Sequence, residues 1–196
     1  MGEMNDLQER LEVSEARNRL NTLVAISVAI ISVFMAITKV KDDNIVQAML
    51  QAKSDAVDSW NEYQAKKLKQ HLAELGLNQV RALQVLAPGK GDGVLADQQK
   101  AYQDTISRYQ KEEESLMGKA KGFEKQYDDL NYRDDQFDLS DATLSISLAM
   151  LAITALTGKR KLLALAWIFA GFGVVIGVAG LLELHLHPSA LTKLLS

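Results

Sequence analysis

The stretch LNTLVAISVAIISVFMAIT, residues 20–38, decides the fold because none of its side chains is charged. A helix rises about 1.5 Å per residue, so about 20 apolar residues cross a hydrocarbon core of about 30 Å. Two further charge-free runs of similar length follow, at 142–158 and at 162–182. The three runs predict an all-α membrane protein with three transmembrane helices.

The polar block between the first two runs is mixed in charge. Residues 41–138 contain 14 Lys or Arg and 18 Asp or Glu. Interspersed charges of both signs are typical of a solvated helix surface, whereas a nucleic-acid-binding protein needs clustered basic charge. We therefore expect no nucleic-acid partner. The chain has no cysteine, which excludes disulfides and thiolate chemistry.

Helical periodicity predicts a hairpin over residues 39–141, with arms at about 41–75 and 95–138 and a tip at about 76–94. In the first arm, Val46, Val57 and Leu68 recur at hendecad spacing, which favours nearly straight packing. Apolar residues of the second arm return in steps of four and three, a heptad pattern in which Glu113 and Asp134 occupy two apolar positions. An antiparallel coiled coil is expected, with its seam at Met49, Trp60, Tyr63, Tyr109, Phe123 and Tyr127.

The distribution of basic residues predicts the orientation of the chain. Lys159, Arg160 and Lys161 fill the turn at 159–161, and basic residues in short loops remain in the cytoplasm. The amino-terminal segment 1–19 then lies on the same side, and it is too acidic and too long for the first part of a signal peptide. The hairpin and the tail 183–196 are expected on the opposite side, which is the periplasm in a bacterium.

Small residues in the apolar runs are the candidate helix-packing sites. Gly173 and Gly177 form a Gly-x-x-x-Gly pair that lets helix backbones approach closely. The candidates are Gly173, Gly177 and Gly180 in the third run, and Ala25 and Ala29 in the first. Because the runs can pair with one another, this pattern supports a compact bundle and only suggests an oligomer.

Acidic residues gather where the two arms would meet the outer face of the membrane. They form a possible cation rim of Asp42, Asp43, Asp134, Asp135 and Asp138. Hard cations bind several carboxylate oxygens, but a solvated acidic rim is also what the orientation rule predicts here. His185 and His187 lack a third strong ligand and are better explained as interfacial residues.

No constellation of nucleophile, base and orienting acid is visible, and no acid lies inside an apolar run, so we expect neither an enzyme nor a cofactor. The leading hypothesis is a non-enzymatic membrane scaffold or accessory subunit. It would assemble through the hairpin and the glycine-rich span, either with copies of itself or within a larger membrane complex. The alternative is a homo-oligomeric cation channel, lined by Ser27 and Ser32 of the first span under an acidic vestibule.

Four segments carry a resemblance to a known family: NRLNTLVAISVAI (18–30), KVKDDNIVQAM (39–49), WNEYQAK (60–66) and DQFDLSDA (135–142). The chain resembles, over nearly its whole length, small bacterial membrane proteins classified as a domain of unknown function. The resemblance implies a bacterial inner-membrane location and a helical hairpin between the first two spans. It implies no catalytic residues.

Overall fold

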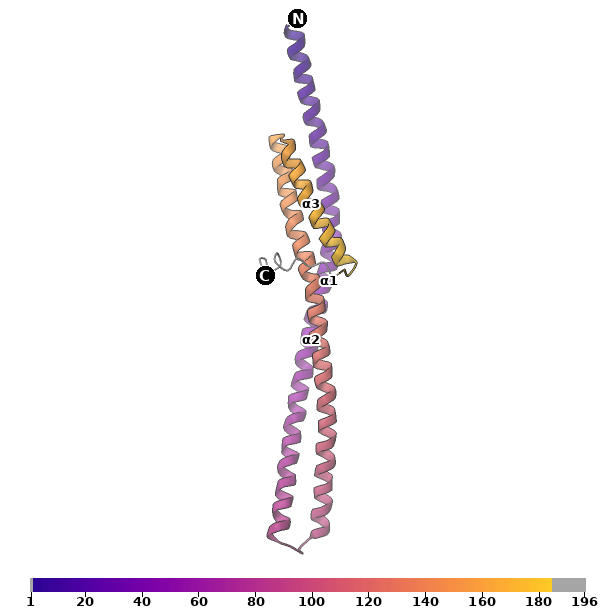
Figure 1. Cartoon of the computed structure of the whole chain (residues 1–196), viewed down its shortest axis with the longest axis vertical. Helices are drawn as coiled ribbons and strands as arrows, with labels where there is room; N and C mark the ends of the chain where they lie inside the picture. Colours follow the sequence, from indigo (N-terminus) through magenta and orange to yellow (C-terminus); the bar gives the residue numbers. More distant parts are fainter. Residues whose placement is uncertain (1, 185–196) are drawn as a thin grey trace. The chain divides into compact units, whose positions relative to one another are not determined.

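The computed structural model describes the backbone of residues 2–184 and the side chains of residues 4, 5 and 8–184 (Figure 1). These residues form three helices and no strand: α1 (Gly2–Leu86), α2 (Asp92–Thr157) and α3 (Arg160–Leu181). The all-helical fold is therefore as predicted. Each helix is long and apolar enough to span a membrane, by length and composition. His185, His187 and most of the predicted tail lie outside the described residues.

Helix α1 is continuous for 85 residues because nothing in its sequence breaks it. Proline, which lacks the backbone N–H that a helix interior needs, first occurs at Pro88. The chain then turns over residues 87–91, where Gly89 and Gly91 have φ values of +84° and +76° that other residues rarely adopt. This turn is shorter than the tip predicted at 76–94.

Gly76, which we expected to begin the tip, instead lies inside α1. A Cβ atom built there would lie 2.5 Å from Cζ of Tyr102 on α2. The glycine therefore provides room for an aromatic ring between two closely packed helices. Gly76 is therefore needed for close packing of the two helices and not for reversal of the chain.

The described chain divides into two compact units, and α1 and α2 contribute to both. Among the described residues, the first unit contains residues 2–47 and 130–184, which include the three apolar runs. Its core is a cluster of large aliphatic side chains from all three helices, together with Ala166. The buried members are Leu20, Val24, Ile31, Leu144, Leu151, Leu163 and Ala166. This cluster packs the apolar runs against one another.

The second unit contains residues 48–129, where α1 and α2 contact each other. The contacting pairs are Lys53 with Tyr127, Trp60 with Glu124, Lys66 with Glu112, and Gly76 with Tyr102. As residue numbers rise along α1, those of its partners fall along α2. Within this unit the two segments therefore run in opposite directions.

Burial along α1 follows a heptad period in this part of the chain. The buried positions lie three or four residues apart within two groups, which are Met49, Ala52 and Ala56, and then Ala73, Leu77 and Val80. The hendecad series of Val46, Val57 and Leu68 lies outside the buried face, since Val57 and Leu68 are 52% and 62% exposed. The α1 segment is apolar on two faces, and α2 covers the face that is richer in alanine.

Candidate functional site

The glycine-rich face of α3 contacts α2 and α1 within the first unit. A Cβ atom at Gly173 would lie 2.6 Å from Oγ1 of Thr143, and one at Gly177 would lie 2.6 Å from Oγ of Ser140. At Gly180 the nearest atom is Cζ of Phe137, 3.1 Å away. All three glycines are buried. The close approach that their spacing suggests is made inside one subunit.

Hydrogen bonds across the helices accompany this close packing. The hydroxyl group of Ser140 donates to the carbonyl oxygen of Gly173, and that of Ser147 donates to the carbonyl oxygen of Ala166, both at 2.8 Å. The side-chain amide of Gln136 donates to the carbonyl oxygen of Leu184, also at 2.8 Å. In a hydrocarbon environment such bonds are worth about 0.6–2 kcal/mol each. They determine the register of α3 against α2.

The small residues of the first apolar run lie on the side of α1 opposite its buried face, which contains Leu20, Val24 and Ile31. Ala25 and Ala29 are exposed, and so are Ser32 and Ala36 at the same helical spacing. Ser27 is engaged within the subunit: its hydroxyl donates to the carbonyl oxygen of Leu23 at 2.8 Å and accepts from Nε1 of Trp167 at 3.0 Å. The small-residue face of α1 therefore has no partner among the described residues.

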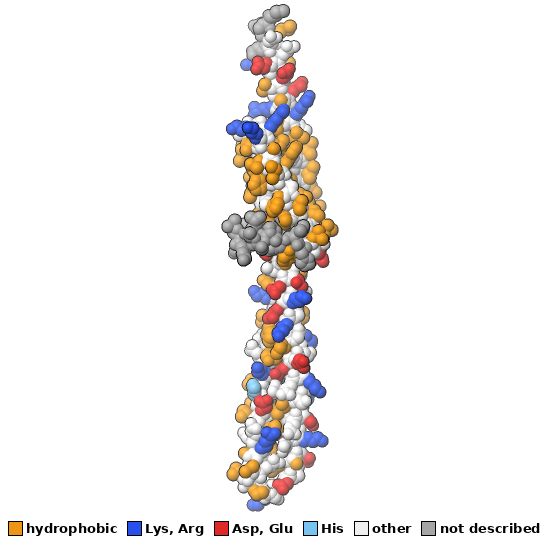
Figure 2. Space-filling view, in the orientation of Figure 1, with side chains coloured by type: hydrophobic (Ala, Val, Ile, Leu, Met, Phe, Trp, Pro, Cys, Tyr) orange, Lys and Arg blue, Asp and Glu red, His pale blue; other side chains and the backbone are white. Residues whose placement is uncertain are grey.

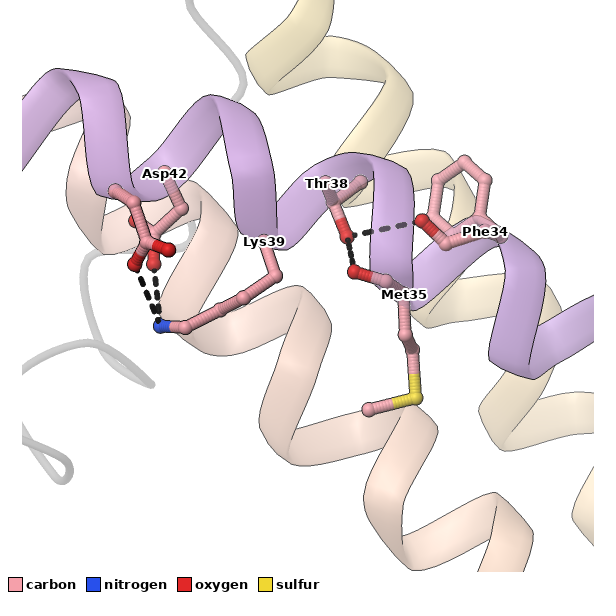
Figure 3. A network of polar contacts seen from close by, with 6 residues as sticks. Phe34, Met35, Thr38, Lys39 and Asp42 are labelled. Carbon is pink, nitrogen blue, oxygen red and sulfur yellow. Dashed lines mark hydrogen bonds and ion pairs between the residues drawn. The ribbon is translucent and has the colours of Figure 1, made fainter.

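The predicted acidic rim begins at Asp42, which is buried. Figure 3 shows Asp42 beside Lys39 of the same helix. Nζ of Lys39, one turn earlier on α1, lies 2.8 Å from Oδ2 of Asp42 and 3.7 Å from Oδ1 of Asp43. Lys39 thus neutralises part of the acidic charge, and the bond with Asp42 raises the pKa of Lys39. Among the described residues, no group of three or more His, Asp or Glu side chains is placed to hold a metal ion.

On α2, Asp134 and Asp138 belong to the same cluster as Asp42. Burial, a hydrogen bond with Asp42 and the charges of Asp138, Asp42 and Asp135 raise the pKa of Asp134 to about 7. Burial and the charge of Asp42 also raise the pKa of Asp138. Oδ1 of Asp42 is buried without a hydrogen-bond donor among the described residues. A proton on Asp134 can serve as a donor to Asp42, and this pairing favours the protonated form of Asp134.

This pair predicts a pH-dependent stability. Because the pKa of Asp134 is raised above 3.8 in the folded chain, stability is lost as the pH rises from about 4 to about 7. We expect the substitution Asp134→Asn to raise the free energy of unfolding at pH 8 by about 1 kcal/mol. The gain is smaller than the free energy that corresponds to the whole pKa shift, because solvent partly screens the carboxyl group. Thermal unfolding of reconstituted protein at pH 5 and pH 8 measures this difference. Asp58→Asn, at an exposed site in the other unit, is the control. An unchanged pH dependence in Asp134→Asn would contradict the pairing.

In the second unit, the predicted seam residues lie at or beside the contact between α1 and α2. Met49, the first of them, is buried, and the other five are partly buried: Trp60, Tyr63, Tyr109, Phe123 and Tyr127. Nε1 of Trp60 donates to Oε1 of Glu124 at 2.8 Å. Nζ of Lys53 lies 5.7 Å from the ring centre of Tyr127, and Nζ of Lys66 lies 5.9 Å from that of Tyr109. The ammonium groups of Lys53 and Lys66 therefore lie over two of these aromatic rings within the subunit.

A second apolar face on α1 escaped the sequence analysis. Leu68, Leu72 and Leu75 are 58–62% exposed and are spaced four and three residues apart. On the facing segment of α2, by contrast, Val94 is the one exposed large hydrophobic residue among those described. The spacing of these leucines was visible in the sequence, but Leu68 had been considered only as part of the hendecad repeat with Val46 and Val57.

The described residues thus define a three-helix chain whose helices can span a membrane and which packs through a glycine face and a paired helical segment. The chain belongs to the family of the domain of unknown function DUF4337, whose model matches residues 20–183. No curated protein and no solved structure matches the chain. Family membership extends over all three apolar runs and assigns no activity.

Proposed function

We propose that this protein is a non-enzymatic scaffold or accessory subunit of the bacterial inner membrane. In this proposal the three apolar runs insert into the bilayer, with the amino terminus in the cytoplasm. Residues 48–129 form an antiparallel coiled-coil hairpin in the periplasm. The observation that carries the proposal is the row of exposed leucines on α1, Leu68, Leu72 and Leu75, opposite the face that packs on α2.

The leucine row has the geometry of a helix-docking face. Residues spaced by four and three lie along one side of a helix and can pack against a similar row on another helix. Copies anchored in one membrane with the same topology present their rows in parallel. The membrane also confines them, which reduces the entropy lost on association. We therefore propose self-assembly as the main mode.

The glycine face does not carry this proposal, because α2 and α1 already cover it within the subunit. The small-residue face of α1 at Ala25 and Ala29 is exposed and is a second contact that self-assembly can use within the bilayer. The channel hypothesis from the sequence stays a prediction. The engagement of the Ser27 hydroxyl with Leu23 and Trp167 leaves that side chain less free to line a pore.

The mass of the gently extracted protein tests the proposal. We expect native mass spectrometry of the full chain in mild detergent to give a mass of at least two copies. The unfolding temperature should rise with protein concentration, because assembly stabilises the folded chain by mass action. A single copy whose unfolding temperature is independent of concentration would contradict self-assembly. Co-extraction of a different subunit in fixed ratio would support the accessory role instead.

A further inference from the structure

A groove in the first unit lies between α1 and the turn that joins α2 to α3. It has a volume of about 370 Å³. Leu20 and Leu156 form part of its apolar wall, while Arg17 of α1 and Arg160 at the start of α3 supply its charge. Gly158 lines it at the turn, with a φ of +66° that reverses the chain between the two helices. The lining of the groove is therefore partly cationic and partly apolar.

Neither arginine is neutralised by a carboxylate among the side chains that the structure describes. Arg19 has a partner, since its guanidinium lies 3.9 Å from Oε2 of Glu15. No acidic residue lines the groove. Arg160 also begins α3, whose first turn contains no acidic residue and whose N-terminus has no side-chain cap. The free N–H groups and the helix dipole there favour an anion.

The surroundings of the groove indicate what kind of anion fits. Leu20 is both a groove residue and the first residue of the apolar run 20–38. On α2 the groove residue Leu156 is exposed, and beyond it α2 exposes aliphatic side chains on the same side of the helix at Ile153 and Ile146. In Figure 2 basic side chains gather at one end of the hydrophobic region. A ligand held by the arginines would therefore extend its apolar part along α2.

We propose that this groove binds the headgroup of an anionic phospholipid. The guanidinium groups of Arg17 and Arg160 hold the phosphate, and the acyl chains lie along the exposed aliphatic side chains of α2. Arginine suits this role because its planar fork of N–H donors matches phosphate oxygens. Basic pockets between membrane helices are known to select anionic headgroups. The inference rests on the membrane insertion proposed above and is independent of self-assembly.

The test is a titration of phosphatidylglycerol into the full chain held in phosphatidylcholine nanodiscs, followed by native mass spectrometry. We expect the double variant Arg17→Gln/Arg160→Gln to bind the first phosphatidylglycerol molecule about 30-fold more weakly than the wild type, because two charge-assisted contacts are lost. The matched control, Arg19→Gln/Lys161→Gln, removes the same charge from the same two helices outside the groove. It should weaken binding by less than about threefold, since exposed charges act through screened attraction. Equal losses in both variants, or no loss in either, would overturn the proposal.

Two further arms separate the possible explanations. Excess inorganic phosphate should leave the bound lipid in place, and its displacement by phosphate would show a site for soluble anions instead. Resistance to carbonate extraction from neutral phosphatidylcholine vesicles reports membrane insertion alone, so its failure is distinguishable from loss of lipid selectivity. If the glutamine variant fails to insert, Arg17→Lys/Arg160→Lys keeps the charge and removes the planar fork. Several-fold weaker binding in that variant supports the proposal, and wild-type binding overturns it.

Discussion

Replacing Gly173 by alanine is expected to destabilise the bundle of apolar helices by about 1–2 kcal/mol, because overpacking outweighs the higher helix propensity of alanine. The new Cβ atom would lie 2.6 Å from Oγ1 of Thr143 and 2.7 Å from Cγ of Leu144, distances that require α3 to move away from α2. Overpacking of this kind costs about 1–3 kcal/mol, whereas the gain in helix propensity is at most about 1 kcal/mol. The hydrogen bond from Ser140 to the carbonyl oxygen of Gly173 would lengthen as well. Thermal unfolding of the reconstituted protein, followed by circular dichroism, measures the loss.

The control for this substitution lies two residues away on the same helix. A Cβ atom at Gly171 meets nothing within 4 Å. Gly171→Ala should therefore leave stability unchanged or raise it by up to about 1 kcal/mol. If the two variants unfold at the same temperature, the close contact between α3 and α2 at Gly173 is not present in the folded protein.

Replacing Leu68, Leu72 and Leu75 together by serine is expected to weaken self-assembly at least 100-fold. Burying these partly exposed leucines against another copy contributes roughly 3–6 kcal/mol per copy, a gain that serine does not reproduce. The isolated subunit should change little, since none of the three side chains is buried within it. Native mass spectrometry over a range of concentrations gives the oligomer distribution, and circular dichroism verifies that helix content is retained.

The matched control places three serines on the exposed side of α2, through Gln103→Ser, Gln110→Ser and Gln126→Ser. This variant should assemble as the wild type does, because it removes no apolar surface. Wild-type assembly by the leucine variant would show that the leucine row is not the contact. An oligomer retained in both variants would point to the small-residue face at Ala25 and Ala29.

Much of the fold follows from local sequence. The run 20–38 and the two later runs predicted helices because they are long and apolar and contain no proline. Because no proline precedes Pro88, α1 continues beyond the first apolar run as far as Leu86. The turn contains fewer residues than predicted, because α1 continues through Gly76 to Leu86. Gly76 lies inside the helix and makes room for the ring of Tyr102.

The candidate sites were only partly visible in the sequence. The spacing of Gly173 and Gly177 indicated a close helix contact, but not that Thr143 and Ser140 of the same subunit would occupy it. The aspartates were recognised as a group, yet the burial of Asp42 depends on how α1 and α2 pack. Arg17 and Arg160 are far apart in sequence, so only the folded chain brings them to one groove.

The sequence by itself determined which segments are helical and which can enter a membrane, because backbone propensity and hydrophobicity are local properties that add along the chain. Only the tertiary structure decided which face of each helix is covered. Helix α1 is apolar on two sides between residues 48 and 86, and periodicity cannot choose between them. Packing against α2 buries Ala52, Ala56 and Ala73 and leaves Leu68, Leu72 and Leu75 exposed. Which face is covered depends on contacts between residues far apart in sequence. In this chain those contacts decide which residues of α1 hold the subunit together and which remain available for assembly.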